Sequence, residues 1–247
     1  MRNPKWHRDE IIFALNLYLD PYRGYIDSRN PNIIELSNLL NMLPFFEVKP
    51  DSEKFRNPNG VSLKMSNFLA LDPKYHGRGM SSYSKLDKKI FDEFYNDRQR
   101  LIKISNAIKG IAQNEKLNSE LKYIENDEES ILDFVQEGQV LYRLHKYRER
   151  NSKIVNFKKK DILQKTGELR CEVCNFSFES EFGELGKGFI ECHHIKPIST
   201  YDSSLTTQIE DLALVCSNCH RMLHRNISSL SINDLKEINI ATKQINS

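Results

Sequence analysis

Four cysteines in the C-terminal third of the chain stand in two pairs, each with two residues between its members. Cys171 and Cys174 form the first pair, and Cys216 and Cys219 form the second. Because each pair can present two thiolates to one tetrahedral ion, this arrangement predicts a structural Zn²⁺ site. The chain between the pairs, residues 175–215, must then leave the ion and return to it. The alternative, four buried free cysteines, requires the spacing to arise by chance.

Four of the seven histidines lie in two short segments beside these cysteines. His193 and His194 are adjacent, at the end of a β-branched and aromatic run that is typical of a strand entering a loop. His220 and His224 follow the second cysteine pair, and on a helix their spacing places both imidazoles on one face, where they can share an ion. A single histidine is more often a structural residue than a ligand. The gathering of four favours a second site that performs chemistry.

These segments resemble the HNH nuclease domain of the zinc-knuckle ββα-metal kind. The resemblance covers Cys171 to Arg225 and depends on residues Gly188–Pro197 (GFIECHHIKP) and Asp211–Arg221 (DLALVCSNCHR). Both segments resemble in particular those of McrA-like modification-dependent restriction endonucleases. Glu137–Arg150 is also similar to the segment that leads into this domain in the same group of enzymes. Residues 6–12 and 56–65 are more loosely similar to the N-terminal head region of some McrA-type enzymes.

The resemblance implies a role for each of the four histidines. His193 would be a ligand of a catalytic divalent cation, together with His220 and His224, and His194 would be the general base. An unligated imidazole can accept a proton near neutral pH, whereas a metal-bound one cannot. His194 would deprotonate a water for in-line attack on phosphorus, while the cation stabilises the developing charge and the leaving 3′ oxygen. Three imidazoles suit Zn²⁺, Co²⁺ or Ni²⁺, whereas nucleases commonly use Mg²⁺ or Mn²⁺, so the identity of the cation stays open.

Asp211 stands where the family has an asparagine that ties the loop after the strand back to itself. A carboxylate accepts hydrogen bonds and donates none, so two interpretations remain. Either backbone N–H groups donate to Asp211 and hold the loop, or its carboxylate lies nearer the metal. The fifth cysteine, Cys192, precedes His193 and would point to the opposite face of a strand, which indicates packing rather than a further ligand.

The first region, residues 1–112, has the apolar spacing of amphipathic helices separated by proline-containing turns. Apolar side chains recur at helical intervals in three stretches between residues 11 and 69. A longer helix is expected after Ser84, over residues 86–104. Because a ββα-metal site contacts the DNA backbone and reads little sequence, we expect DNA recognition to reside in this helical region.

Charge divides the rest of the chain. Residues 113–136 form an acidic stretch that we interpret as a connector, and residues 137–247 are expected to form the nuclease domain, with a basic amphipathic helix at its start. A basic strip beside a phosphate-cutting site would bind the DNA backbone, although a charge run is as often a solvated face. The expected fold class is α+β. The candidate DNA contacts are Arg143, Lys146 and Arg150 in the strip and Arg56 and Arg78 in the first region.

Total composition excludes few functions. The 247 residues carry 36 Lys and Arg against 34 Asp and Glu, a net charge of +2, so overall charge neither indicates nor excludes nucleic-acid binding. No apolar run approaches the roughly eighteen residues of a membrane helix, and Asn3, Pro4 and Trp6 break any signal-peptide pattern. Cysteines confined to one cluster are a poor disulfide framework, so we expect a cytoplasmic protein without a membrane partner.

Together these features predict a two-domain, metal-dependent endonuclease that hydrolyses phosphodiester bonds in double-stranded DNA. The expected cofactors are structural Zn²⁺ and a catalytic cation, Mg²⁺, Mn²⁺, Co²⁺ or Ni²⁺. The resemblance implies restriction of foreign DNA that contains a modified base such as 5-methylcytosine, and cutting both strands with one site per chain implies a homodimer or sequential nicking. Two alternatives stay open: an HNH endonuclease indifferent to modification, and a zinc-stabilised DNA-binding module without catalysis.

Overall fold

The computed structural model describes residues 3–46, 49, 51–77, 80, 82–122, 139–149, 152–195, 208–225 and 230–245. The chain divides into two compact units. The first contains Met1–Glu125 and Gly138–Leu141, and the second contains Asn126–Glu137 and Tyr142–Ser247. Among the described helices, none has the length and apolar character that spanning a bilayer requires.

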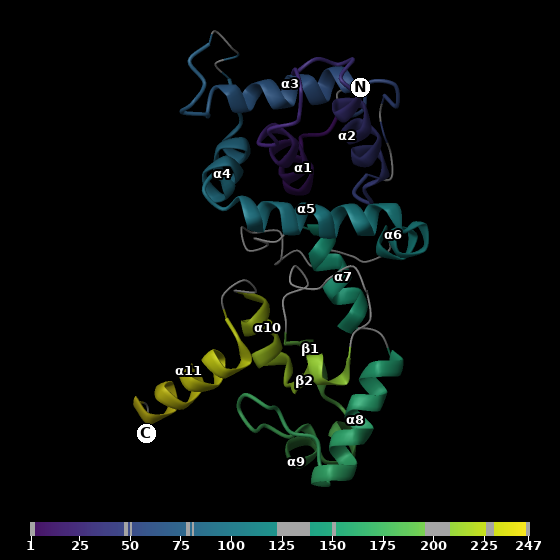
Figure 1. The fold of residues 1–247 in the computed structure, drawn as a ribbon. Helices are drawn as coiled ribbons and strands as arrows, with labels where there is room; N and C mark the ends of the chain where they lie inside the picture. The colour runs from purple at the N-terminus through teal and green to yellow at the C-terminus, as the bar shows by residue number, and fades with distance from the viewer. Residues whose placement is uncertain are drawn as a thin grey trace. The chain divides into compact units, whose positions relative to one another are not determined.

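The described part of the first unit is helical (Figure 1). Its helices are α1 (Arg8–Tyr18), α2 (Pro31–Met42), α3 (Pro58–Leu69), α4 (Lys85–Phe94), α5 (Arg98–Gln113) and α6 (Glu115–Lys122). A polar side chain precedes each of the first five and accepts a hydrogen bond from a backbone N–H of the first turn, which otherwise lacks a partner. These capping residues are His7, Asn30, Asn57, Ser84 and Asp97.

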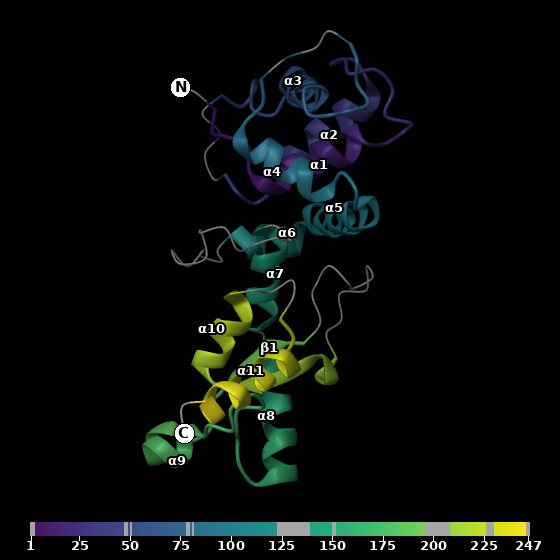
Figure 2. The ribbon, with the colours of Figure 1, turned by 90° about the vertical axis from the view of Figure 1, so that its left-hand side faces the viewer.

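Helix α1 lies at the centre of the first unit, where α2, α3, α4 and α5 pack around it (Figures 1 and 2). Two buried carboxylates at its start have specific partners. The Glu10 carboxylate binds the Arg56 guanidinium, with Nε to Oε1 at 2.6 Å and Nη2 to Oε2 at 2.8 Å. Asp9 Oδ2 accepts a hydrogen bond from the backbone N–H of Val140 at 2.9 Å. Pairing of this kind is what makes a buried charge tolerable in a core.

The single helix expected after Ser84 is two helices. α4 ends at Phe94, and α5 begins at Arg98, because Asp97 caps the second helix by accepting a hydrogen bond from the Arg100 N–H at 3.2 Å. The prediction of one long helix was therefore wrong. The apolar spacing continues from α4 into α5 because both helices bury apolar side chains in the core of the first unit, so the spacing does not reveal the turn between them.

The stretch interpreted as a connector begins with a helix. In α6, Leu117 and Leu121 are buried, and the Asn118 amide donates to the Met42 carbonyl at 2.7 Å. These contacts make α6 part of the first unit, which therefore extends beyond residue 112. The remainder of the stretch, from residue 123 onward, lies outside the described residues.

The second unit contains a two-stranded sheet and helices. Strands β1 (Glu191–His194) and β2 (Leu212–Val215) are antiparallel, with Glu191 opposite Val215 and His194 opposite Leu212. Helix α10 (Ser217–Arg225) follows β2 directly, which is the ββα order that the resemblance implied. The other elements are α7 (Gln139–Glu149), which begins in the first unit, α8 (Ser152–Thr166), α9 (Phe178–Phe182), the 3₁₀ helices η2 (Gly183–Gly186) and η4 (Ile209–Asp211), and α11 (Ile232–Ile245).

Side chains along β1 and β2 alternate between the two faces of the sheet, and the two faces pack against different helices. Cys192 shares one face with Leu212 and Leu214, and apolar side chains of α8 pack against this face. Glu191 and His193 belong to the other face, against which α10 packs. Cys192 is thus a core residue, in agreement with its interpretation from the sequence.

Candidate active site

The structure brings the two cysteine pairs together. The Sγ atoms of Cys171, Cys174, Cys216 and Cys219 all lie within 4.8 Å of one another, and those of Cys174 and Cys216 are 3.7 Å apart. Two sulfurs on one tetrahedral Zn²⁺ are separated by about 3.8 Å, since each Zn–S bond is about 2.3 Å. The donor chemistry and the spacing therefore fit zinc, and these four cysteines can hold a structural Zn²⁺ ion.

The surroundings of the thiols couple zinc binding to protons. Burial, together with the neighbouring Cys171, raises the pKa of the Cys219 thiol far above its usual range. Burial also raises the pKa of Cys174. At Cys171 the effect of burial is outweighed by hydrogen bonds from backbone N–H groups, which lower its pKa. Because zinc binds thiolates, binding must displace protons from the buried thiols.

Three imidazoles form a second cluster beside the first. One ring nitrogen from each of His193, His220 and His224 lies within 4.8 Å of the other two. His193 comes from β1, whereas His220 and His224 lie one turn apart on α10, and their Nε2 atoms are 2.8 Å apart. Convergent imidazole nitrogens suit a borderline divalent cation such as Zn²⁺, Ni²⁺ or Co²⁺. The three predicted ligands are thus close enough to one another that they could hold a metal ion.

Glu191 contacts this cluster, and the sequence analysis did not single it out. Its Oε2 atom lies 2.5 Å from His220 Nδ1, and its Oε1 atom accepts a hydrogen bond from Ser217 Oγ at 2.7 Å. The signal that could have revealed it is strand alternation, because Glu191 precedes His193 by two residues and shares its face.

His194, the predicted base, is the last residue of β1 and is 2% exposed. The chain is held directly after it, because the Ile195 N–H donates to the Asp211 backbone carbonyl at 2.8 Å. The Asp211 carboxylate accepts in turn from the Gln208 N–H at 3.1 Å. Of the two interpretations of Asp211, the first describes this geometry: a backbone N–H donates to the carboxylate. Among the described residues, the imidazole cluster does not include the Asp211 carboxylate.

Arg56, a predicted DNA contact, is a structural residue of the first unit. Its side chain is 4% exposed and is paired with Glu10. The guanidinium also donates to the carbonyls of Pro4 and Lys5 at 3.1 and 3.0 Å and lies 4.7 Å from the ring centre of Trp6. The geometry therefore argues against contact between Arg56 and DNA, and it gives Trp6 a packing role.

The other predicted DNA contacts lie in different surroundings. On α7, Arg143 is 9% exposed and Lys146 is half-buried. Arg78 and Arg150 lie outside the described residues. Among the five predicted DNA contacts, Lys146 is the one with a described side chain that is partly accessible.

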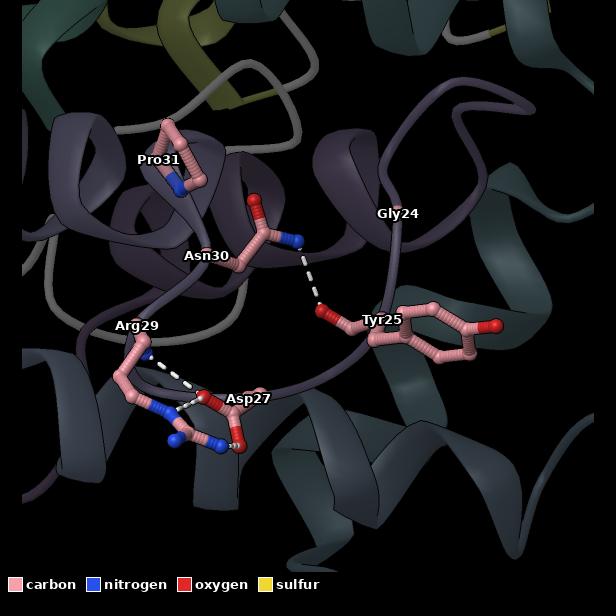
Figure 3. A pocket seen from close by; sticks show the side chains of 6 residues that line it. All are labelled: Gly24, Tyr25, Asp27, Arg29, Asn30 and Pro31. Atoms are coloured by element: carbon pink, nitrogen blue, oxygen red, sulfur yellow. Dashed lines mark hydrogen bonds and ion pairs between the residues drawn. The ribbon is translucent and has the colours of Figure 1, made fainter.

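A pocket in the first unit lies on the turn between α1 and α2 (Figure 3). Its polar side chains are engaged within the turn: Arg29 binds Asp27, and the Asn30 amide donates to the Tyr25 carbonyl at 2.7 Å (Figure 3). They build the turn and provide no set of catalytic or metal-binding groups. The pocket has a volume of about 480 Å³ and is lined by Gly24, Tyr25, Asp27, Arg29, Asn30 and Pro31.

Comparison with protein families agrees with this geometry. The family model described as HNH endonuclease matches residues 171–226, which contain both cysteine pairs and all four histidines of the site. This segment is an HNH endonuclease domain, and its presence supports a nuclease of the HNH family with DNA as the substrate. No curated protein and no solved structure matches the chain.

Proposed function

We propose that this protein is a metal-dependent endonuclease that hydrolyses phosphodiester bonds in double-stranded DNA. His193, His220 and His224 converge near the end of β1, and His194 is the last residue of that strand. The convergence of the three imidazoles is the observation that carries the proposal. The cluster lies within the segment that matches HNH endonucleases. A purely structural zinc domain needs the four thiolates but has no use for three converging imidazoles.

The residues of the site divide the chemistry among them. His194 takes the proton from the water that attacks phosphorus, because its imidazole is outside the set that would hold the cation. His193, His220 and His224 would hold a divalent cation, which when bound stabilises negative charge on the phosphate and on the leaving 3′ oxygen. Asp211 holds the chain that follows His194 and so keeps the base in place.

We further propose that the first unit recognises the DNA and that the recognised feature is a modified base such as 5-methylcytosine. A ββα-metal site contacts backbone and sugar, which carry no sequence information. The separate helical unit is large enough to supply recognition. The similarity of its sequence to the head of McrA-type enzymes supports a modified target, that is, restriction of foreign DNA.

A double-strand break requires two such sites or two successive cuts. We propose that two copies of the chain act together on DNA, because a symmetric dimer presents one site to each strand. We also propose that the protein works in the cytoplasm, where reducing conditions keep the thiols available for zinc.

A plasmid digestion panel tests the proposal. Matched plasmids with 5-methylcytosine, with 5-hydroxymethylcytosine and without modification are incubated with the purified protein and Mg²⁺, Mn²⁺, Co²⁺ or Ni²⁺. We expect cleavage of a modified plasmid with at least one ion. Equal rates on all three plasmids would remove modification dependence and leave a general HNH endonuclease.

The His194→Ala variant is the control for the active site. We expect it to retain zinc and DNA binding and to lose cleavage, because the general base contributes roughly 10²–10⁴-fold to such reactions. Full activity in this variant would refute the assigned base. A wild-type protein that binds DNA but nicks it with none of the four ions would instead indicate a zinc-stabilised DNA-binding module.

A further inference from the structure

Glu191 connects the imidazole cluster to the second cysteine pair. It is the first residue of β1, and its carboxylate reaches across to the first turn of α10. One oxygen lies 2.5 Å from His220 Nδ1, and the other accepts from Ser217 Oγ at 2.7 Å. Ser217 itself lies between Cys216 and Cys219. Both carboxylate oxygens therefore have a partner on α10.

This contact determines which nitrogen of His220 can bind a cation. An ionised carboxylate only accepts hydrogen bonds, so the nitrogen that faces it must carry the proton. In the neutral ring that binds a cation, this contact places the proton on Nδ1 and the lone pair on Nε2. The Nε2 atom faces the cluster, since it lies 2.8 Å from Nε2 of His224. Without the carboxylate, both tautomers and other rotations of the ring become available.

We propose that Glu191 is a positioning residue that holds His220 in the tautomer and rotation needed for metal binding, and that Ser217 holds Glu191 in turn. The inference rests on the proposed function, because it assigns a role toward the cation of that site. A carboxylate on the distal nitrogen of a histidine ligand also makes the ligand more basic. Glu191 thus raises the affinity of the cluster for a divalent cation without touching the ion.

The same contacts link the two clusters mechanically. Cys216 and Cys219 bracket Ser217, and His220 follows Cys219 directly. The His220 N–H also donates to the Cys216 carbonyl at 2.9 Å. The position of His220 therefore depends on that of the second cysteine pair in two ways. One is the backbone of α10, and the other is the pair of side-chain contacts made by Ser217 and Glu191.

Calorimetric titration of Ni²⁺ into the full-length protein, loaded with one Zn²⁺ ion per chain so that the imidazole cluster is left open, tests the proposal. We expect Glu191→Ala to weaken Ni²⁺ binding roughly 10- to 100-fold, the usual effect of losing such a partner. Glu191→Gln keeps an oxygen that accepts from Nδ1, so its loss should be smaller. Ser217→Ala removes one hydrogen bond from the carboxylate and should also cause a smaller loss. Glu184→Ala is the matched control, because this exposed glutamate of the same unit is paired with Lys187 and is expected to leave Ni²⁺ affinity unchanged.

Imidazole ¹⁵N spectra of the same zinc-loaded proteins provide a readout that a general loss of stability does not mimic. We expect His220 to be protonated on Nδ1 in the wild type and in Glu191→Gln, and to show mixed tautomers in Glu191→Ala. Wild-type Ni²⁺ affinity and tautomer in Glu191→Ala would overturn the positioning role while leaving the proposed function intact. A wild-type chain that binds zinc but no further ion would overturn both proposals.

Discussion

The Nε2 atoms of His220 and His224 lie 2.8 Å apart, one turn from each other on α10. The second cysteine pair lies at the start of this helix, where the His220 N–H donates to the Cys216 carbonyl. His193 belongs to the face of the sheet next to α10. A ligand set positioned by a helix and a strand loses little freedom when it binds a cation. The imidazole cluster is thus arranged by the fold of the second unit.

The first prediction concerns the ligands. His224→Ala should reduce Ni²⁺ affinity by more than the roughly 10- to 100-fold expected for loss of an outer partner, because a direct donor is removed. The zinc content should remain one ion per chain, since the thiolates are unchanged. Calorimetry with zinc analysis of the same sample checks both. Undiminished Ni²⁺ binding would show that the three imidazoles do not share an ion.

The second prediction concerns zinc. Cys174→Ser should unfold the second unit while the helices of the first persist, because structural zinc contributes roughly 10–16 kcal/mol in small domains. The circular dichroism signal should therefore fall only in part. A zinc-free protein with an intact second unit, seen as unchanged protease resistance of residues 142–247, would contradict a structural role.

The third prediction concerns pH. Zinc affinity should fall as pH falls, because burial raises the pKa of Cys174 and Cys219 and zinc must displace their protons. The raised pKa means that the thiols are protonated at neutral pH in the absence of zinc, so proton release accompanies binding. Titrations in buffers of different ionisation enthalpy measure this release. Binding without release of protons would show that the thiolates form without the ion.

The fourth prediction separates the two interpretations of Asp211. Asp211→Asn keeps an oxygen that accepts from the Gln208 N–H, so Ni²⁺ affinity and cleavage should stay close to wild type. Asp211→Ala loses this acceptor and should lower cleavage about tenfold or more through movement of His194. Weak Ni²⁺ binding in Asp211→Asn would instead place the carboxylate at the metal.

The fifth prediction concerns Arg56. Its replacement by alanine leaves the buried Glu10 carboxylate without its ion-pair partner, so it should destabilise the first unit by roughly 3–5 kcal/mol. The matched control is Arg29→Ala, whose exposed pair with Asp27 should leave stability unchanged. Urea unfolding measures both. A stable Arg56→Ala protein with reduced DNA affinity would restore the role expected from the sequence.

Local sequence patterns predict which residues can bind metal, and the structure brings the predicted residues together. The spacing within each cysteine pair and the spacing of His220 and His224 are local properties, and local backbone geometry converts them directly into a turn or a helical face. The same holds for the strand that ends at His194 and for most helices of the first unit, whose apolar periods and capping residues act within one element. These features were predictable because each depends on neighbours in the chain.

Contacts between elements that are far apart in the sequence arise only in the folded chain. Glu191 contacts His220 because β1 packs beside α10, and Arg56 is buried where it pairs with Glu10, 46 residues away in the sequence. Strand alternation places Glu191 on the same face as His193 but does not identify His220 as its partner. The sequence around Arg56 likewise does not reveal whether this arginine faces DNA or a buried carboxylate. Pairing across the core depends on where whole helices and strands pack, which is a property of the folded chain.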